Sequence, residues 1–300
     1  MAVVLKEDYV QGLEEYHKFV VAIIEKNYDL GIRFFENYAW GLVSTTFYIK
    51  SRKGDFTAKI SNYTVESEKQ TQVDKVMSDF LRNEIPTSEY IKTLDNMICL
   101  KFKDPNGEEK LLRITKHLVG MSPFGMKYNY LESGISWLKK LHFHTLPPEN
   151  LIKLPYLSLD NSTKYLLHGD MTPNNLLIFF EKVDAMLDFG LSSVGPVEYD
   201  LGRLALFTWF RMPGVDFQEI LQTTSNYYTR SSVEFNFDSN RRIDINEISV
   251  NQKLIKHFAG EHCSSYLKDV LKHRKLYLDD AKWQADYDFV KTKLEELLRN

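Results

Sequence analysis

Two carboxylates and an amide at defined spacing are the residues of this sequence that point most directly to chemistry. Asp170 and Asn175 lie five residues apart in the segment HGDMTPNN (residues 168–175), which leads into an apolar run. Asp188 follows thirteen residues after Asn175 and begins Asp-Phe-Gly. Phosphoryl transfer from a nucleoside triphosphate uses such a set: one carboxylate accepts the proton of the attacking hydroxyl, while an amide oxygen and a second carboxylate hold magnesium on the phosphates.

The order and spacing match the kinase series H-x-D-L-x-x-x-N followed by D-F-G, with Met171 in place of the leucine. The alternative is that Asp170, Asn175 and Asp188 are ordinary turn residues, since Asp and Asn favour turns. That alternative needs three turn residues to fall at kinase spacing by coincidence. We therefore predict that Asp170 is the catalytic base and that Asn175 and Asp188 are magnesium ligands.

With Gly195-Pro196 and Tyr199-Asp200-Leu201 downstream, this segment resembles the aminoglycoside phosphotransferase and choline kinase superfamily. The resemblance implies an α+β, bilobal protein-kinase-like fold, use of ATP and Mg²⁺, and a small-molecule hydroxyl as the phosphate acceptor. It also implies that Asp200 accepts hydrogen bonds from the backbone of the catalytic loop. His168 is expected to hold that loop by hydrogen bonding rather than to take part in chemistry. The choice between ATP and GTP stays open.

Two features disfavour a kinase that acts on proteins. Protein kinases usually carry arginine before the catalytic aspartate, where this chain has Gly169. Eleven residues separate Asp188 from Asp200, which leaves no room for a long activation segment. A pseudokinase that only binds is the alternative from another functional class, and it is weakened because all the expected catalytic residues are present.

The composition fits a globular protein with a sizeable core. The 300 residues are 43% hydrophobic and 13% aromatic, enough for one bilobal unit or two small domains. The net charge of −3 gives no overall basic field, so a nucleic-acid partner is not expected. Cys99 and Cys263 are far apart and lack metal-site spacing, which fits a reducing compartment.

No secretory signal and no apolar run of membrane-spanning length is seen in the sequence. We therefore expect a cytoplasmic protein without membrane insertion. The oligomeric state cannot be inferred from these patterns.

Hydrophobic periodicity predicts the elements of both lobes. In an N-lobe of residues 1–116 we expect a helix over 7–26, strands at 32–35, 42–50 and 56–60, a helix through 73–81, and a hairpin from 98–102 and 110–115. In a C-lobe of residues 117–300 we expect helices over 131–142, 216–230, 251–275 and 279–299. Two hairpins around one helix is the order expected of a kinase N-lobe.

Lys59 lies on the third strand-like run, where an ammonium group should meet the α- and β-phosphates of ATP. Asp74 is the preferred acidic partner on the following helix, and Glu66 is the alternative. Asp74 is shorter than the glutamate usual in the family, and an exposed acid beside the buried helix face is the other interpretation.

The nucleotide loop has no G-x-G-x-x-G pattern. Instead, Gly41 would form a tight turn, and Ser44 or Thr45 would supply hydroxyl and amide donors to the phosphates. An ordinary hairpin turn is the alternative. His117 and Val119 lie where the hinge between the lobes should be, so they are assigned to the nucleotide site as well.

The acceptor is predicted from the last helical segment. Asp280, Trp283 and Tyr287 share one helix face, and a carboxylate beside aromatic rings suits a cationic amine. The alternative is that the two rings simply bury an amphipathic helix. The first hypothesis favours an aminoglycoside-type antibiotic or an amino alcohol, with choline or ethanolamine, homoserine and sugars as alternatives.

Overall fold

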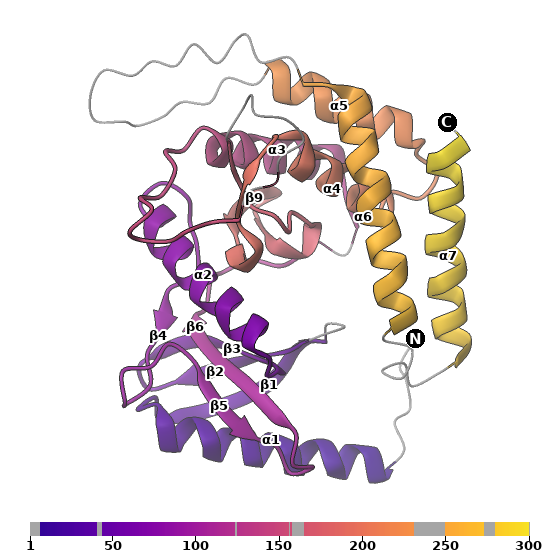
Figure 1. Cartoon of the computed structure of the whole chain (residues 1–300). Coiled ribbons are helices and arrows are strands. Elements are labelled where there is room, and N and C mark those ends of the chain that lie inside the picture. Colours follow the sequence, from indigo (N-terminus) through magenta and orange to yellow (C-terminus); the bar gives the residue numbers. More distant parts are fainter. Residues whose placement is uncertain are drawn as a thin grey trace. The chain divides into compact units, whose positions relative to one another are not determined.

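The computed structural model describes residues 7–40, 44–123, 125–155, 157, 165–230, 250–272 and 280–299, without the side chains of residues 7–13, 38–40 and 280 (Figure 1). The chain forms two compact units. The first combines Met1–Lys75 with Ser88–Leu118, and the second combines Val76–Thr87 with Val119–Asn300. The division into lobes 1–116 and 117–300 stays a prediction, and each unit is described by itself below.

The first unit is an antiparallel sheet with helices. Its elements are α1 (Glu7–Asn27), β1 (Ile32–Trp40), β2 (Ser44–Ser51), β3 (Gly54–Asn62), the first part of α2 (Val65–Leu81), β4 (Tyr90–Ile91), β5 (Leu100–Lys103) and β6 (Glu109–Lys116). The predicted helices and hairpins are all present. Compared with the prediction, the first strand is five residues longer, α2 begins eight residues before the predicted helix at 73–81, and β4 is an additional strand.

The sheet order is β1-β2-β3-β6-β4, and β5 pairs with β6. The β2–β3 hairpin turns through Arg52 and Lys53, since Ser51 pairs with Gly54. The β5–β6 hairpin closes at Asp104, whose side chain accepts backbone hydrogen bonds from Asn106 and Glu108. The turn residues of the sequence therefore set the register of both hairpins.

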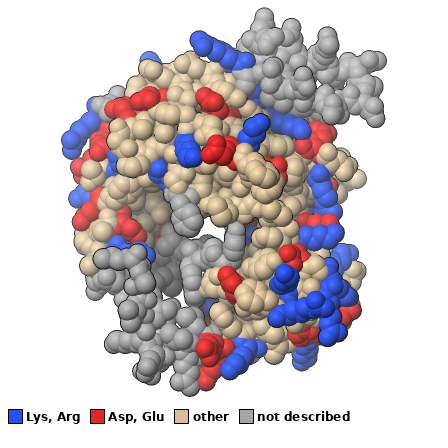
Figure 2. Space-filling view, turned by 180° about the vertical axis from the view of Figure 1, so that it is seen from behind, with Lys and Arg blue, Asp and Glu red and all other residues tan. Residues whose placement is uncertain are grey.

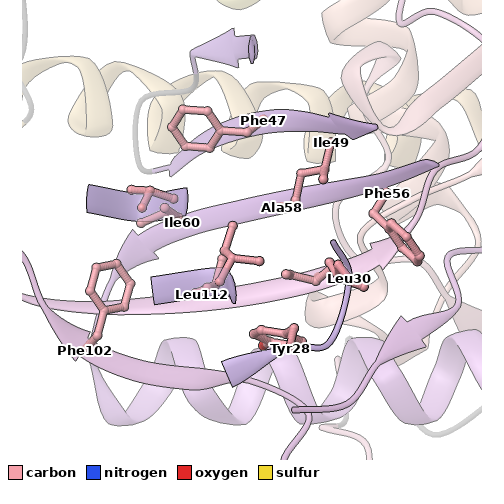
Figure 3. Close-up of a cluster of buried hydrophobic side chains, with 12 residues drawn as sticks. Tyr28, Leu30, Phe47, Ile49, Phe56, Ala58, Ile60, Phe102 and Leu112 are labelled. Atoms are coloured by element: carbon pink, nitrogen blue, oxygen red, sulfur yellow. The ribbon is translucent and has the colours of Figure 1, made fainter. Parts of the chain in front are cut away.

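Strict alternation gives the sheet two different faces. On β3, Phe56, Ala58 and Ile60 are buried, while Thr57 and Lys59 between them point to the opposite face and are half-buried. Figure 3 shows the buried set gathered on one side of the sheet with residues of neighbouring strands. Side chains of α1 pack against this cluster, so α1 covers the apolar face (Figure 1).

The second unit is mostly helical. Its elements are the last part of α2, α3 (Tyr128–His142), β7 (Tyr165–Leu167), η1 (Pro173–Asn175), β8 (Leu176–Phe179), β9 (Lys182–Met186), η2 (Phe189–Leu191), β10 (Ser193–Gly195), α4 (Glu198–Trp209), α5 (Phe217–Arg230), α6 (Gln252–Lys272) and α7 (Asp280–Arg299). The four helices predicted beyond residue 130 are present. The mixed α and β class predicted from the sequence is confirmed.

Acidic and basic side chains are interspersed over the face shown in Figure 2, which agrees with the small net charge of −3. None of the helices in the described ranges is both long enough and apolar enough to cross a membrane.

Candidate active site

The candidate residues fall in both units, and each group is described within its own unit. In the second unit, the catalytic segment runs from β7 through η1 into β8. Its beginning is held by β10, which pairs with β7 through Ser193 and Leu167. Its end is held by β9, which pairs with β8 through Met186 and Leu176. Two short ladders therefore fix both ends of the loop that contains Asp170.

Glycine at position 169 is required by the backbone. Gly169 has a φ of +81°, and a Cβ atom there would lie 1.9 Å from the carbonyl oxygen of Leu191. No side chain fits at that distance. The close approach of the loop to η2 thus explains why this chain carries glycine where protein kinases usually carry arginine.

Asp170 is held by two side chains and stays accessible. Asn175 Nδ2 donates to the Asp170 backbone oxygen at 2.7 Å and to its Oδ2 at 3.0 Å. The Arg203 guanidinium forms an ion pair with Oδ1 of the same carboxylate. The Asp170 side chain is 25% exposed, so the carboxylate can still receive a proton from a hydroxyl group.

The β8–β9 hairpin brings the two predicted metal ligands together. Asn175 precedes β8, and its backbone oxygen accepts a hydrogen bond from Leu187 N at 2.9 Å. Asp188 is the next residue after Leu187, at φ +64° and ψ +61°. Asp tolerates this left-handed conformation better than most residues. The thirteen-residue spacing in the sequence is therefore the length of one hairpin, which places Asp188 close to Asn175.

These two oxygen donors fit a magnesium site completed by phosphates. Because the Asn175 amide nitrogen donates to Asp170, its Oδ1 is the atom that remains for a cation. Over the described ranges, no group of three or more His, Cys, Asp or Glu side chains could hold a metal ion. Mg²⁺ commonly uses one or two protein carboxylates together with substrate phosphates, so a full protein cage is not needed.

Asp200, at the start of α4, holds the catalytic loop from behind. This fully buried carboxylate accepts hydrogen bonds from His168 N at 2.7 Å and Gly169 N at 2.9 Å. Burial by itself would raise the pKa of Asp200, but the hydrogen bonds from the His142 side chain and the His168 backbone, with the electrostatic interaction of both residues, bring the pKa below its ordinary value. The carboxylate therefore stays ionised and can accept both backbone hydrogen bonds.

The buried His168 ring ties the loop to the end of β9. Its Nε2 lies 2.9 Å from the Leu187 backbone oxygen, which can only accept, so Nε2 carries the proton. Its Nδ1 accepts from Asp170 N at 3.3 Å. The Phe189 ring packs against it at a centroid distance of 4.6 Å. Because both ring nitrogens hydrogen-bond to the backbone, His168 has a structural role in the loop.

Arg203 was missed in the sequence analysis. It lies three residues after Asp200 on α4, so both side chains share a helix face. Its Nη1 donates to His262 Nδ1 at 3.3 Å. Burial and the neighbouring Arg203 lower the pKa of His262 to about 4, which keeps the imidazole neutral and able to accept. The three-residue offset from Asp200 is a signal that could have identified Arg203.

In the first unit, Lys59 lies on the polar face of the sheet. Its partner on β6 is Arg113, so both side chains point to the same face. Asp74 on α2 is buried, pairs with Arg113 at 3.3 Å and accepts a hydrogen bond from the Tyr90 hydroxyl. Glu66, the alternative, is exposed in the first turn of α2. Asp74 is thus placed on the Lys59 face, and Arg113 is a neighbour that sequence reasoning did not find.

The pairing of β2 with β3 separates the two predicted donors of the nucleotide loop. Ser44 pairs with Ser61 and shares the face of Lys59, whereas Thr45 pairs with Ile60 on the apolar face. Thr46, directly opposite Lys59, was not predicted. Thr45 could therefore contribute only its backbone to a ligand on the Lys59 face. Gly41 lies outside the described residues.

His117 lies at the end of the first unit. Its Nδ1 is 3.1 Å from Thr57 Oγ1, and its backbone nitrogen donates to Asp55 O at 2.9 Å. Burial lowers the pKa of His117, although the nearby Asp55 opposes this shift. Val119, in the second unit, is 64% exposed. Their assignment to a nucleotide site stays a prediction.

The structure gives different results for the acceptor residues predicted on α7. Trp283 is buried, its indole nitrogen donates to the Val270 backbone oxygen of α6 at 3.1 Å, and its ring stacks on Tyr287 at 5.4 Å. Trp283 therefore packs α7 against α6, which is the alternative interpretation that it buries an amphipathic helix. The side chain of Asp280 lies outside the described part of the structure.

Comparison with known proteins adds independent information on the family. A family model described as "Phosphotransferase enzyme family" matches residues 139–233, which contain Asp170, Asn175 and Asp188. A comparison with curated protein sequences gave no match.

Three solved structures share the fold over nearly their whole length. An amicoumacin kinase, solved with AMP-PNP and Ca²⁺, is 11% identical, with 97% of this chain and 96% of that chain covered and a TM-score of 0.63. A microcompartment-associated aminopropanol kinase is 11% identical, with coverage of 94% and 97% and a TM-score of 0.65. A choline kinase from Streptococcus pneumoniae is 12% identical, with coverage of 94% and 99% and a TM-score of 0.58.

The match of a phosphotransferase family model to residues 139–233 agrees with the resemblance noted in the sequence. At these low identities the structural similarities establish the fold, which is the protein-kinase-like fold predicted from the sequence. The family match covers the catalytic segment itself.

We predict that Gly169→Ala abolishes most phosphotransfer activity, because the new Cβ would force the loop away from Leu191 and displace Asp170. Gly214→Ala is a matched control, since Gly214 has a similar φ of +82° but nothing within 4 Å of an added Cβ. Both variants should lose about 1 kcal/mol or more of stability from positive-φ strain. Turnover and urea unfolding are the measurements, and equal turnover in the two variants would contradict the steric explanation.

Proposed function

We propose that the protein is an ATP- and Mg²⁺-dependent phosphotransferase that moves the γ-phosphate to a hydroxyl group of a small molecule. The observation that carries this proposal is the placement of Asp170, held by Asn175 and Arg203, beside the hairpin end that carries Asp188. This is the set of groups that phosphoryl transfer requires.

In this proposal, Asp170 orients the acceptor hydroxyl and receives its proton late in the transfer. Asn175 and Asp188 hold Mg²⁺, which would neutralise charge on the β- and γ-phosphates. Lys59, with Asp74 on the same sheet face, would position the α- and β-phosphates. GTP is an alternative donor. Arg203 fixes the rotamer of Asp170, so the base is oriented before the acceptor arrives.

The acceptor that we propose is a hydroxyl-bearing amine. The structural neighbours include an aminopropanol kinase and a choline kinase, which supports a hydroxyl-bearing amine as the first class to test. Because the Arg203 guanidinium lies at Asp170, an acidic group that attracts an amine must lie elsewhere. Asp280 is still proposed for that role, while the buried Trp283 is not.

The direct test is transfer of ³²P from γ-labelled ATP to a panel of acceptors, with and without Mg²⁺. The panel should include aminoglycosides, amino alcohols such as choline and ethanolamine, homoserine and neutral sugars. We expect transfer to at least one cationic acceptor. Transfer to neutral or anionic acceptors alone would remove the cationic class but keep the kinase, whereas no transfer at all would favour the binding module.

We expect Asp170→Asn to lower kcat by roughly 10²–10⁴, the usual contribution of a positioned general base, with little change in ATP affinity. Asp184→Asn is the matched control, because Asp184 is an exposed aspartate on β9 of the same unit. Steady-state kinetics with the best acceptor measures the effect. Near-normal turnover of Asp170→Asn would refute its assignment as the base.

Asp188→Asn should abolish transfer and raise the Mg²⁺ concentration needed for any residual activity, because it weakens an oxygen ligand of the metal. Asn175→Ala should do the same more mildly, although it also removes the hydrogen bonds to Asp170. Activity is measured over a Mg²⁺ titration at fixed ATP. Unchanged Mg²⁺ dependence in both variants would contradict the ligand assignment.

A further inference from the structure

Behind the catalytic loop, three buried side chains form a continuous hydrogen-bonded chain. His142 at the end of α3 bridges Asp200 of α4 and Tyr228 of α5: its Nε2 lies 3.1 Å from Asp200 Oδ2, and its Nδ1 lies 2.8 Å from the Tyr228 hydroxyl. All three side chains are essentially inaccessible to solvent. The same Asp200 oxygen that His142 contacts also accepts the hydrogen bond from His168 N of the loop.

The proton positions in this chain follow from its two ends. Asp200 is an ionised acceptor, so His142 Nε2 must carry the proton that it donates. Burial, with smaller contributions from Tyr165, Glu198 and Asp200, raises the pKa of Tyr228 well above its usual value, so the phenol keeps its proton. A hydroxyl that keeps its proton can donate to His142 Nδ1, and this arrangement matches an imidazole ring that carries its proton on Nε2.

Tyr228 is also held at its backbone. The Lys139 ammonium, buried on α3, donates to the Tyr228 carbonyl oxygen at 2.8 Å and lies 5.5 Å from the centre of its ring. A positive charge at the C-terminal turn of α5 is favourable for the helix dipole. Lys139 and His142 lie three residues apart on one helix, so α3 hydrogen-bonds to Tyr228 at both its backbone carbonyl and its hydroxyl.

We propose that Tyr228 is a positioning residue for the phosphotransfer reaction: its hydroxyl hydrogen-bonds to His142 Nδ1, holds the ring with Nε2 toward Asp200, and thereby sets the position of the catalytic loop. This role rests on the proposed function, because it acts through the loop that carries Asp170. Without the hydroxyl, His142 Nδ1 is a buried acceptor that has lost its donor. The imidazole ring then loses one of its two hydrogen bonds, and rotation of the less restrained ring weakens the remaining hydrogen bond to Asp200.

The test compares Tyr228→Phe with Tyr227→Phe. Tyr227 is the preceding residue on α5, and its hydroxyl contacts Ser136 at 3.4 Å rather than His142, so the chemical change is the same and the location differs. We expect kcat of Tyr228→Phe to fall roughly fivefold to fiftyfold, as for loss of one buried hydrogen bond expressed in the transition state. KM for nucleotide and acceptor should stay within about twofold, and Tyr227→Phe should resemble the wild type.

Nitrogen NMR of histidine-labelled protein gives a readout that does not depend on activity. In the wild type, His142 should be protonated at Nε2 and unprotonated at Nδ1. Its Nδ1 resonance should shift in Tyr228→Phe and not in Tyr227→Phe. An Nδ1-protonated His142 in the wild type overturns the proposal, and so does a Tyr228→Phe variant with unchanged resonances and unchanged kcat.

The NMR result also separates this proposal from the proposed function. If the wild type transfers no phosphate to any acceptor, the proposed function fails. The His142 resonances still show whether Tyr228, His142 and Asp200 are hydrogen-bonded as described. If Tyr228→Phe does not fold, the tautomer of the wild type decides it. A fall in kcat with an unchanged His142 spectrum counts against Tyr228 acting through His142.

Discussion

The catalytic segment depends on one buried carboxylate. Asp200 accepts hydrogen bonds from the backbone nitrogens of His168 and Gly169, and removing it would leave two donors unsatisfied in the interior. An ionised group that is fully buried needs full compensation, which two backbone donors and the His142 ring provide. Since the backbone at residues 168 and 169 is held in this way, the backbone position of Asp170 is fixed. Arg203 and Asn175 then fix the Asp170 side chain.

Two local constraints complete the segment. The loop approaches η2 so closely that residue 169 has room only for glycine, and the β8–β9 hairpin converts a spacing of thirteen residues into proximity between Asn175 and Asp188. Neither constraint involves a long-range hydrophobic contact. The site geometry in the second unit is therefore built from turns, short ladders and one buried charge, while the surrounding helices supply the stability.

Side chains along the strands of the first unit alternate between two faces of the sheet, one apolar and one polar. Its apolar face forms a core with α1 (Figure 3). Its polar face carries Lys59 beside Arg113, and Asp74 of α2 pairs with Arg113. A shift of one residue in the β2–β3 register would exchange these faces and bury Lys59. The turn at Arg52 and Lys53 therefore matters for the proposed nucleotide site as much as for the fold.

The sequence alone determined the fold class, most helices and both hairpins, because hydrophobic periodicity and turn residues are local signals. It also predicted a site formed by Asp170, Asn175 and Asp188, and the structure brings these residues together because their spacing reflects one loop and one hairpin. Contacts between distant segments needed the tertiary structure. Arg203 reaches Asp170 across thirty-three positions, and Tyr228 reaches His142 across eighty-six. Trp283 could serve a ligand or a helix interface, and only the packing of α7 on α6 decided for the interface, because its sequence pattern is the same in both cases.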